Sequence, residues 1–206
     1  MIRFFLLAAI LSFPSRGEAL EQTPRIFVSQ MANEVLIVLQ QPDISADAKI
    51  NQIETITDKR FHFPTIARLV AARNWRKLSK TQQSAFRREF QKHLSVTYGR
   101  NVSRFDNQTT AITGDRAEPR GDWTVQTVIL DPSGEDLLVD YRLRKIQNRW
   151  QVIDVVVERI SLVANFRAQV QELFTKRGVT ATLAFLQEKN AKGQSILPDD
   201  KATPGR

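Results

Sequence analysis

The stretch from Trp150 to Gly178 constrains the fold of this chain more than any other part of it. Residues 150–158 are rich in valine and place apolar side chains on both faces of a strand, which predicts a strand covered on both sides. Residues 161–177 follow with almost no loop and carry apolar side chains at helical spacing, and Gly178 ends this helix. The stretch therefore predicts a sheet that packs directly against a helix.

Three more strands and five more helices are expected around this unit. Turns rich in Pro, Gly, Asn and Asp separate the strands, which favours antiparallel pairing of consecutive strands. These strands are expected at 111–118, 122–130 and 137–143. The additional helices are expected at 24–41, 43–57, 64–74, 79–104 and 180–190. The fold class is therefore α+β, with a twisted four-stranded antiparallel sheet curled against about six helices.

The longest predicted helix, 79–104, begins with a capping box formed by Ser79 and Gln82. It carries a stripe of large side chains at a spacing of four residues, which are Phe86, Phe90, Leu94 and Tyr98. A stripe with this spacing lies on one face of a helix and ordinarily packs in a core. The pattern alone therefore predicts packing and does not identify a ligand.

The N-terminus reads as a secretory signal peptide over residues 1–19. Its apolar run, 4–13, is too short for a membrane span, which takes about 20 residues. We expect a single domain over 20–190, a flexible tail over 191–206, and a soluble periplasmic location. The chain contains no cysteine, so the exported fold has to rely on packing without disulfides.

The chain is basic, with a formal net charge of +8 at pH 7. In a cytosolic protein this charge would favour nucleic acid as a partner, but export makes nucleic acid an improbable one. The acidic partners that remain are anionic lipid headgroups and the acidic faces of other envelope proteins.

Residues for catalysis are sparse. The two histidines, His62 and His93, are not grouped with a nucleophile or with other metal ligands, so no metal and no cofactor are expected. Asp140 and Asp154 interrupt apolar strands, and a buried carboxylate in a curved sheet can act as a general base. The alternative is that each pairs with an arginine such as Arg142 or faces water.

Three segments of the chain resemble the MlaC (toluene-tolerance auxiliary) family of periplasmic phospholipid carriers. They lie at 61–76, 86–98 and 150–167, and the third is the most specific. The chain departs from the family pattern at Ala71-Ala72 and at Arg159. These departures leave open a hopanoid-associated branch of the same superfamily, whose members carry a polycyclic lipid.

The resemblance implies an NTF2-like cradle in which lipid tails lie between the sheet and the helices. It implies a carrier that shuttles phospholipid between an outer-membrane lipoprotein–porin complex and the substrate-capture ring of an inner-membrane ABC transporter. It implies no cofactor and no reaction. Two acyl chains of about 15 carbons cost roughly 20 kcal/mol to bring into water, so such a pocket is expected to approach or exceed about 1,000 Å³.

Under this hypothesis the acyl chains contact apolar side chains from several elements. The residues expected to line the pocket are Phe86, Phe90, Leu94, Tyr98, Val139, Tyr141, Val152, Val155, Val157, Leu162, Val163, Phe166 and Val170. The residues expected near the headgroup are Arg100, Arg159 and Arg167, since guanidinium groups bind phosphate well.

Three other readings remain open from the sequence. The chain could carry a hopanoid, or it could be an NTF2-like enzyme that acts on a hydrophobic substrate through Asp140 or Asp154. It could also be a structural module of the envelope, which would contain no cavity. An apolar pocket without polar groups at depth favours a carrier, whereas an enzyme needs a carboxylate and an oxyanion donor near one substrate atom.

Overall fold

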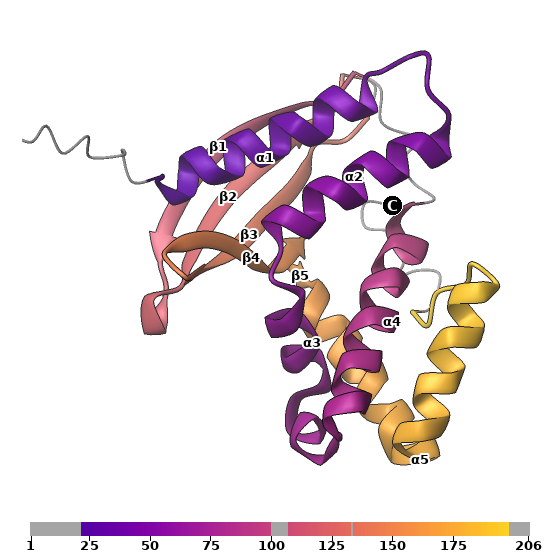
Figure 1. The fold of residues 1–206 in the computed structure, drawn as a ribbon. Helices are drawn as coiled ribbons and strands as arrows, with labels where there is room; N and C mark the ends of the chain where they lie inside the picture. Colours follow the sequence, from indigo (N-terminus) through magenta and orange to yellow (C-terminus); the bar gives the residue numbers. More distant parts are fainter. Residues whose placement is uncertain (1–21, 100–106, 133, 198–206) are drawn as a thin grey trace, which may run out of the picture.

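The computed structural model describes residues 22–99, 107–132 and 134–197 (Figure 1). The expected signal peptide and the last part of the expected tail lie outside these residues. The described chain is α+β, with five α-helices and a five-stranded antiparallel sheet. The sequence thus predicted the fold class correctly, but both of its element counts differ from those in the structure.

The sheet is a meander in which each strand pairs with the next along the chain. Its strands are β1 (Thr109–Ala117), β2 (Trp123–Leu130), β3 (Leu137–Ile146), β4 (Arg149–Val157) and β5 (Ile160–Ser161). The sequence predicted four strands and missed β5. The chain reverses after β4 through Glu158 and Arg159, which adopt φ of 46° and 66°. Neither residue type is common at positive φ, so nothing in the sequence marked this turn.

The helices are α1 (Pro24–Leu39), α2 (Ala46–Arg60), α3 (Phe63–Ala71), α4 (Lys80–Gly99) and α5 (Leu162–Ala191). A short 3₁₀ helix, Ala72–Lys77, joins α3 to α4. The two helices predicted after the sheet are joined within α5, which is interrupted at Gly178 by non-helical backbone, as the sequence indicated. Because α5 is counted as one element, the described residues contain five α-helices where about six were expected. The kink lies at Gly178, with φ 74° and ψ 175°, a conformation that glycine adopts without a steric penalty.

Apolar side chains form two separate cores. Helix α1 packs across the sheet, chiefly over β1 and β2 (Figure 1). The buried side chains of this sheet core come from α1, β2, β3 and β4, and they are Phe27, Val28, Met31, Val125, Leu143 and Val152. In the helical core, α3, α4 and α5 pack on one another around aromatic rings. Phe90 and Phe166 meet edge to face, with ring centroids 5.1 Å apart. The chain therefore consists of two packed units that share β4 and the segment between α2 and α3.

Two connections hold these units together. Phe61 forms a parallel bridge with Val152 of β4, and the His62 N–H donates to the Val152 carbonyl over 2.9 Å. On the other side of β4, the buried carboxylate of Asp154 accepts the Ser161 hydroxyl at 2.6 Å and the Val163 N–H at 3.0 Å. The first turn of α5 is thereby bound to the sheet, because an acceptor satisfies an N–H group that has no partner within the helix.

His93 connects α4 to the C-terminal end of α5. Its Nε2 accepts the Ile196 N–H at 3.0 Å, so its proton resides on Nδ1 and is donated to Asn190 Oδ1 at 2.7 Å. Asn190 in turn donates to the Glu89 carbonyl at 2.9 Å. Burial lowers the pKa of His93 below its ordinary value of 6.5, an effect that the Asn190 hydrogen bond partly opposes. The ring is therefore held neutral in the folded chain.

This neutral ring makes the stability of the fold depend on pH. Below about pH 6.5 the unfolded chain takes up a proton at this position that the folded chain resists, so the free energy of unfolding should decrease as the pH falls. We expect urea midpoints measured from pH 7.5 to pH 5 to decrease more steeply for the wild type than for His93→Gln. His62→Gln should keep most of the wild-type slope. Equal slopes for wild type and His93→Gln would contradict this assignment.

Candidate functional site

A cavity of about 610 Å³ lies between the two cores. Its walls come from α2, α4, the segment between α2 and α3, β4 and the start of α5. Phe61 belongs to the surroundings of both cores, so it lies where the two units meet. The cavity is thus a product of the way the sheet unit and the helical unit are joined.

Most of the wall is apolar. The apolar side chains that line the cavity are Ile50, Ile53, Phe61, Phe63, Leu94, Tyr98, Val155 and Leu162. The rings of Phe61 and Phe63 stack with centroids 6.0 Å apart. Dispersion contacts with such a wall have no preferred direction, so the cavity suits flexible apolar ligands of varied shape.

The α2 wall is held differently from the others. Helix α2 contains no buried residue, and Ile50 and Ile53 are only half-buried. The helix is stabilised locally, since the Ser45 hydroxyl accepts the Ala48 N–H at its start and Lys59 and Arg60 lie in its last turn. Ile56 packs against the sheet core, whereas Ile50 and Ile53 belong to neither core and are therefore available to a ligand.

Gly99 allows α2 to approach the end of α4. A Cβ atom at this position would lie 3.3 Å from Cδ1 of Ile50, which is closer than most side-chain contacts. A larger residue here would therefore require the Ile50 side chain to shift.

Tyr98 places one polar atom in the apolar wall. Its hydroxyl is buried and has no hydrogen-bond partner among the described residues. Burial strongly raises the pKa of this phenol, so it stays protonated at neutral pH. An unsatisfied buried hydroxyl costs about 1–3 kcal/mol, which a ligand oxygen in the cavity would relieve.

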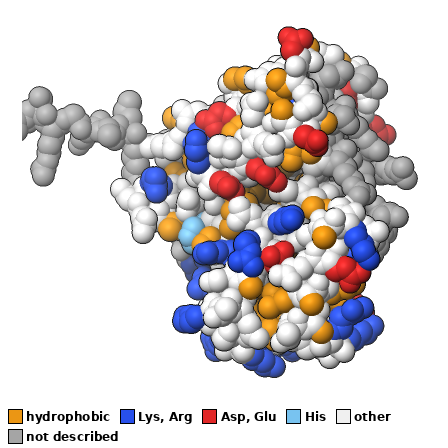
Figure 2. Space-filling model, turned by 45° about the vertical axis from the view of Figure 1, so that its right-hand side comes forward, with side chains coloured by type: hydrophobic (Ala, Val, Ile, Leu, Met, Phe, Trp, Pro, Cys, Tyr) orange, Lys and Arg blue, Asp and Glu red, His pale blue; other side chains and the backbone are white. Residues whose placement is uncertain are grey.

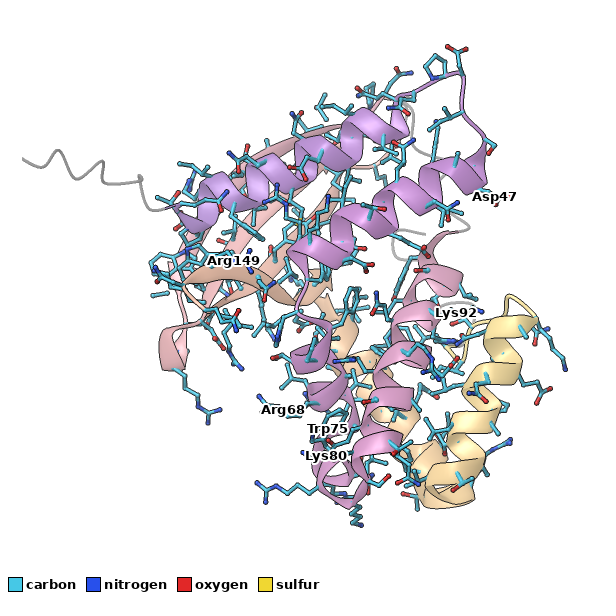
Figure 3. All side chains as sticks on the ribbon, viewed as in Figure 1. Asp47, Arg68, Trp75, Lys80, Lys92 and Arg149 are labelled. Atoms are coloured by element: carbon cyan, nitrogen blue, oxygen red, sulfur yellow. The ribbon has the colours of Figure 1, made fainter. Side chains whose placement is uncertain are left out.

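Charged and amide side chains surround the mouth of the cavity. Helix α2 contributes Glu54 and Asp58, and α4 contributes Arg88, Gln91 and Lys92 (Figure 3 labels Lys92). Gln91 donates to the Asp58 carboxylate across the mouth at 2.5 Å. The site is therefore apolar at depth and charged at its entrance.

The structure brings together four of the thirteen residues that were predicted to contact acyl chains, namely Leu94, Tyr98, Val155 and Leu162. Five others lie in the helical core, which are Phe86, Phe90, Val163, Phe166 and Val170. Four belong to the sheet, where Val139, Val152 and Val157 are buried and Tyr141 packs on the sheet core. These nine side chains pack one layer against another, and their contact with a ligand stays a prediction.

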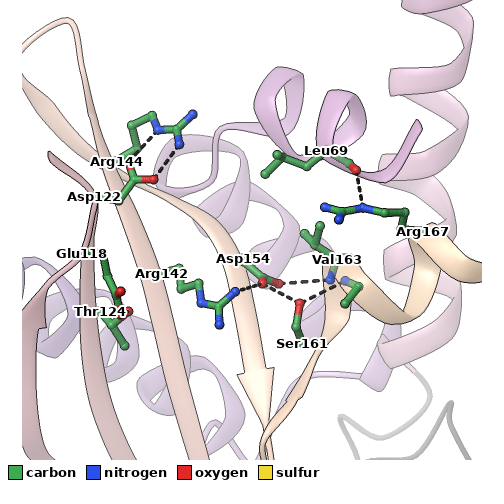
Figure 4. A network of polar contacts seen from close by, with 11 residues as sticks. Leu69, Glu118, Asp122, Thr124, Arg142, Arg144, Asp154, Ser161, Val163 and Arg167 are labelled. Carbon is green, nitrogen blue, oxygen red and sulfur yellow. Dashed lines mark hydrogen bonds and ion pairs between the residues drawn. The ribbon is translucent and has the colours of Figure 1, made fainter. Parts of the chain in front are cut away.

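Of the three predicted headgroup arginines, the two that the structure describes, Arg159 and Arg167, do not line the cavity. Arg159 is exposed in the turn between β4 and β5. Arg167 directs its Nε–H to the Leu69 carbonyl at 2.8 Å (Figure 4). Arg100 lies outside the described residues. Among the described residues, the cations at the mouth are Arg88 and Lys92, which the sequence did not single out for this role.

The carboxylate of Asp154 binds groups that hold the sheet and α5 together. Besides Ser161 and Val163, it pairs with Arg142 at 3.2 Å, so both of its oxygens have partners (Figure 4). Burial raises the pKa of Asp154, and these hydrogen bonds oppose the rise. Because Val155 lines the cavity, the side chain next to it in the strand points to the other face of the sheet. The sequence left two roles open for Asp154, a general base or the partner of an arginine, and the structure shows it paired with Arg142.

Asp140 lies on the same outer face of the sheet. It pairs in register with Val156 of β4, which neighbours Val155, so alternation directs it away from the cavity. Burial raises the pKa of Asp140, while Arg116 and Arg142 oppose the rise. Neither carboxylate is among the residues that line the cavity, so neither supports the enzyme hypothesis.

Sequence reasoning missed the α2 wall and most of the mouth. A signal was present, since α2 is a polar helix whose few apolar residues include Ile50 and Ile53 at a spacing of three. So narrow a stripe indicates a contact on one side only. Phe61 and Phe63 were read only as a break between helices, although two aromatic rings so close together at a break also need an apolar surface to cover them.

The described part of the chain contains no group of three or more His, Cys, Asp or Glu side chains placed to hold a metal ion. None of its helices combines the length and apolar character of a bilayer span.

Comparisons with known proteins agree with this geometry. The model of the family described as MlaC protein matches residues 29–188. A phospholipid-binding protein from Ralstonia solanacearum, solved in complex with a phospholipid, is similar in structure with a TM-score of 0.74 and 25% sequence identity. The match covers 81% of this chain and 96% of the Ralstonia chain.

The unsatisfied hydroxyl in the cavity leads to a test. Tyr98→Phe removes a buried polar atom without changing the packing, so the ligand-free protein should become more stable by about 1 kcal/mol. The measurement is urea unfolding of delipidated wild type and variant. A less stable variant would show that the hydroxyl has a partner that the described residues do not supply.

Proposed function

The chain belongs to the MlaC family, and on that premise we propose that it is a periplasmic phospholipid carrier whose acyl chains enter the cavity between α2, α4 and the sheet. The binding unit corresponds to residues 20–190, preceded by the signal peptide over 1–19. The proposal is for binding and carrying, without a chemical reaction.

One observation carries this proposal: an apolar cavity lies between two independent cores and opens through a charged mouth. Burying a CH₂ group is favourable by about 0.8 kcal/mol, so acyl chains partition strongly into such a wall. The charged mouth keeps the headgroup at the surface, where water and ionic side chains solvate it. The phospholipid bound to the Ralstonia protein supports this choice of ligand.

The volume of the cavity limits how a lipid fits. About 610 Å³ is smaller than the 1,000 Å³ or more that the sequence analysis anticipated for two acyl chains. The core residues of the other walls are tightly packed, whereas α2 has no buried residue. We therefore propose that α2 moves away from α4 to admit a diacyl lipid.

The shuttle that the family resemblance implies remains part of the proposal. In it, the carrier receives phospholipid from one membrane complex and delivers it to the other, an outer-membrane lipoprotein–porin complex and an inner-membrane ABC transporter. An exposed mouth suits this role, because a partner can reach the headgroup without unfolding the carrier.

Replacement of Ile53 tests the cavity. Ile53→Asp places a charge against the acyl chains but removes no core contact, so the variant should fold normally and lose nearly all bound phospholipid. Native mass spectrometry followed by lipid extraction gives the lipid per chain. Val163 and Phe166 are unsuitable for this test, because a charge at either buried position would destabilise the helical core.

The matched control for this experiment is Ile37→Asp on α1, where the isoleucine is 54% exposed and does not line the cavity. It should retain about one phospholipid per chain. Equal lipid content in Ile53→Asp and Ile37→Asp would contradict the assignment of the cavity. A hopanoid extracted from the wild type would move the ligand to the related branch of the superfamily.

The movement of α2 can be tested by tying it to α4. The chain lacks cysteine, so Asp58→Cys with Gln91→Cys introduces the only two thiols, at positions whose native side chains are in contact. A short thiol-reactive cross-linker should block uptake of phospholipid from vesicles and prevent release from preloaded protein. The same double variant without cross-linker is the control, and unchanged uptake after cross-linking would show that α2 need not move.

A further inference from the structure

The mouth of the cavity carries opposite charges on its two sides. The charged residues from α2 are both acidic, and those from α4 are both basic. Acidic side chains gather mainly in the upper half of the face shown in Figure 2, and Lys and Arg gather mainly in its lower half. The entrance therefore has a negative side and a positive side that face each other.

The negative side consists of Glu54 and Asp58. They are four residues apart on α2, so they lie on the same side of that helix one turn apart. Neither takes part in an ion pair with a described residue, and Asp58 accepts only the neutral amide of Gln91. Two carboxylates with unused acceptor capacity thus line the entrance.

The positive side consists of Arg88 and Lys92, which are also one turn apart, on α4. Lys92 has no ion-pair partner among the described residues. Arg88 is 69% exposed and makes a long contact of 3.3 Å with its neighbour Glu89. A long ion pair whose cation is mostly exposed contributes little, so both cations remain able to bind an anion.

The two sides lie within reach of one headgroup. Gln91, which is next to Lys92 in the chain and less than one turn from Arg88, contacts Asp58 directly. The helices are therefore separated by no more than two side chains at this point. Beneath them, the unpaired hydroxyl of Tyr98 offers a donor for an ester oxygen of the same ligand.

From this arrangement we propose that the mouth selects a zwitterionic headgroup that carries a phosphodiester and a primary ammonium, in preference to an anionic headgroup. The phosphate oxygens accept hydrogen bonds from Arg88 and Lys92, and the ammonium donates to Glu54 and Asp58. This inference rests on the proposed function, since it names the class of phospholipid that the cavity takes.

An anionic headgroup fits the same mouth less well. A phosphoglycerol group satisfies the cations but leaves two carboxylates facing a negative ligand without a counter-charge. The net positive charge of the chain attracts anionic lipids at long range, but salt screens that attraction beyond about 8–10 Å. Contacts at the mouth therefore decide between lipids that share the same acyl chains.

The test uses vesicles that contain equal amounts of phosphatidylethanolamine and phosphatidylglycerol with identical acyl chains. Full mature protein is incubated with excess vesicles and recovered, and native mass spectrometry gives the lipid per chain and the ratio of the two classes. One exposed charge pair changes an equilibrium by up to about fivefold. We therefore expect the wild type to favour phosphatidylethanolamine on the order of fivefold.

Glu54→Gln with Asp58→Asn should abolish this preference, so that the ratio of the two classes in the recovered protein equals that in the vesicles. The charge-matched control is Asp43→Asn with Asp47→Asn, two acidic residues near the start of α2 that do not line the cavity (Figure 3 labels Asp47). Arg88→Gln with Lys92→Gln should weaken binding of both classes, whereas Lys80→Gln with Arg87→Gln should not. The four positions changed in the two mouth variants, Glu54, Asp58, Arg88 and Lys92, are exposed or half-buried. The thermal midpoints of these variants should therefore stay close to that of the wild type.

The outcomes separate this inference from the proposed function. A wild-type ratio equal to that of the vesicles, with one lipid per chain, would overturn the selectivity and leave the carrier role intact. An equal change of ratio in the control and mouth variants would also overturn it, because net charge would then be the cause. No lipid of either class in the wild type would overturn both.

Discussion

The carboxylate of Asp154 makes the contact on which the rest of the architecture depends. It lies 5% exposed on β4, accepts the Ser161 hydroxyl and the Val163 N–H, and so fixes the start of α5 against the sheet. The direction of α5 in turn determines where α3 and α4 pack, because these three helices share one core. A polar residue inside an apolar strand therefore contributes orientation, since a directional hydrogen bond sets an angle that apolar contacts leave free.

The cavity follows from the presence of two cores in one chain. The sheet core is completed by α1, and the helical core is completed by α3, α4 and α5. Helix α2 packs against α1 and adds Ile56 to the edge of the sheet core, but it contains no buried residue, and its Ile50 and Ile53 face the space between the units. The ligand site therefore has one wall that is less deeply packed than the others, which suits a carrier of large flexible molecules.

The acidic and the basic side chains at the mouth of the cavity come from different helices. The composition gives only a net excess of basic residues, which is a statement about long-range attraction. At the mouth, however, acidic residues of α2 face basic residues of α4 across a single hydrogen bond. Local pairing of opposite charges affects specificity, whereas net charge affects the rate of encounter.

The sequence by itself determined the α+β class, the four long strands, the helix positions within a few residues, and the family, because these depend on periodicities and motifs read along the chain. It also predicted Leu94, Tyr98, Val155 and Leu162 as pocket residues, and these four line the cavity. Only the tertiary structure separated Phe86 and Phe90, which pack in a core, from Leu94 and Tyr98 on the same helix, which line the cavity. It also placed Ile50 and Ile53 in the cavity wall and Arg88 and Lys92 at its mouth. Periodicity shows which side chains share a face, but the element that meets this face depends on contacts between residues far apart in the sequence.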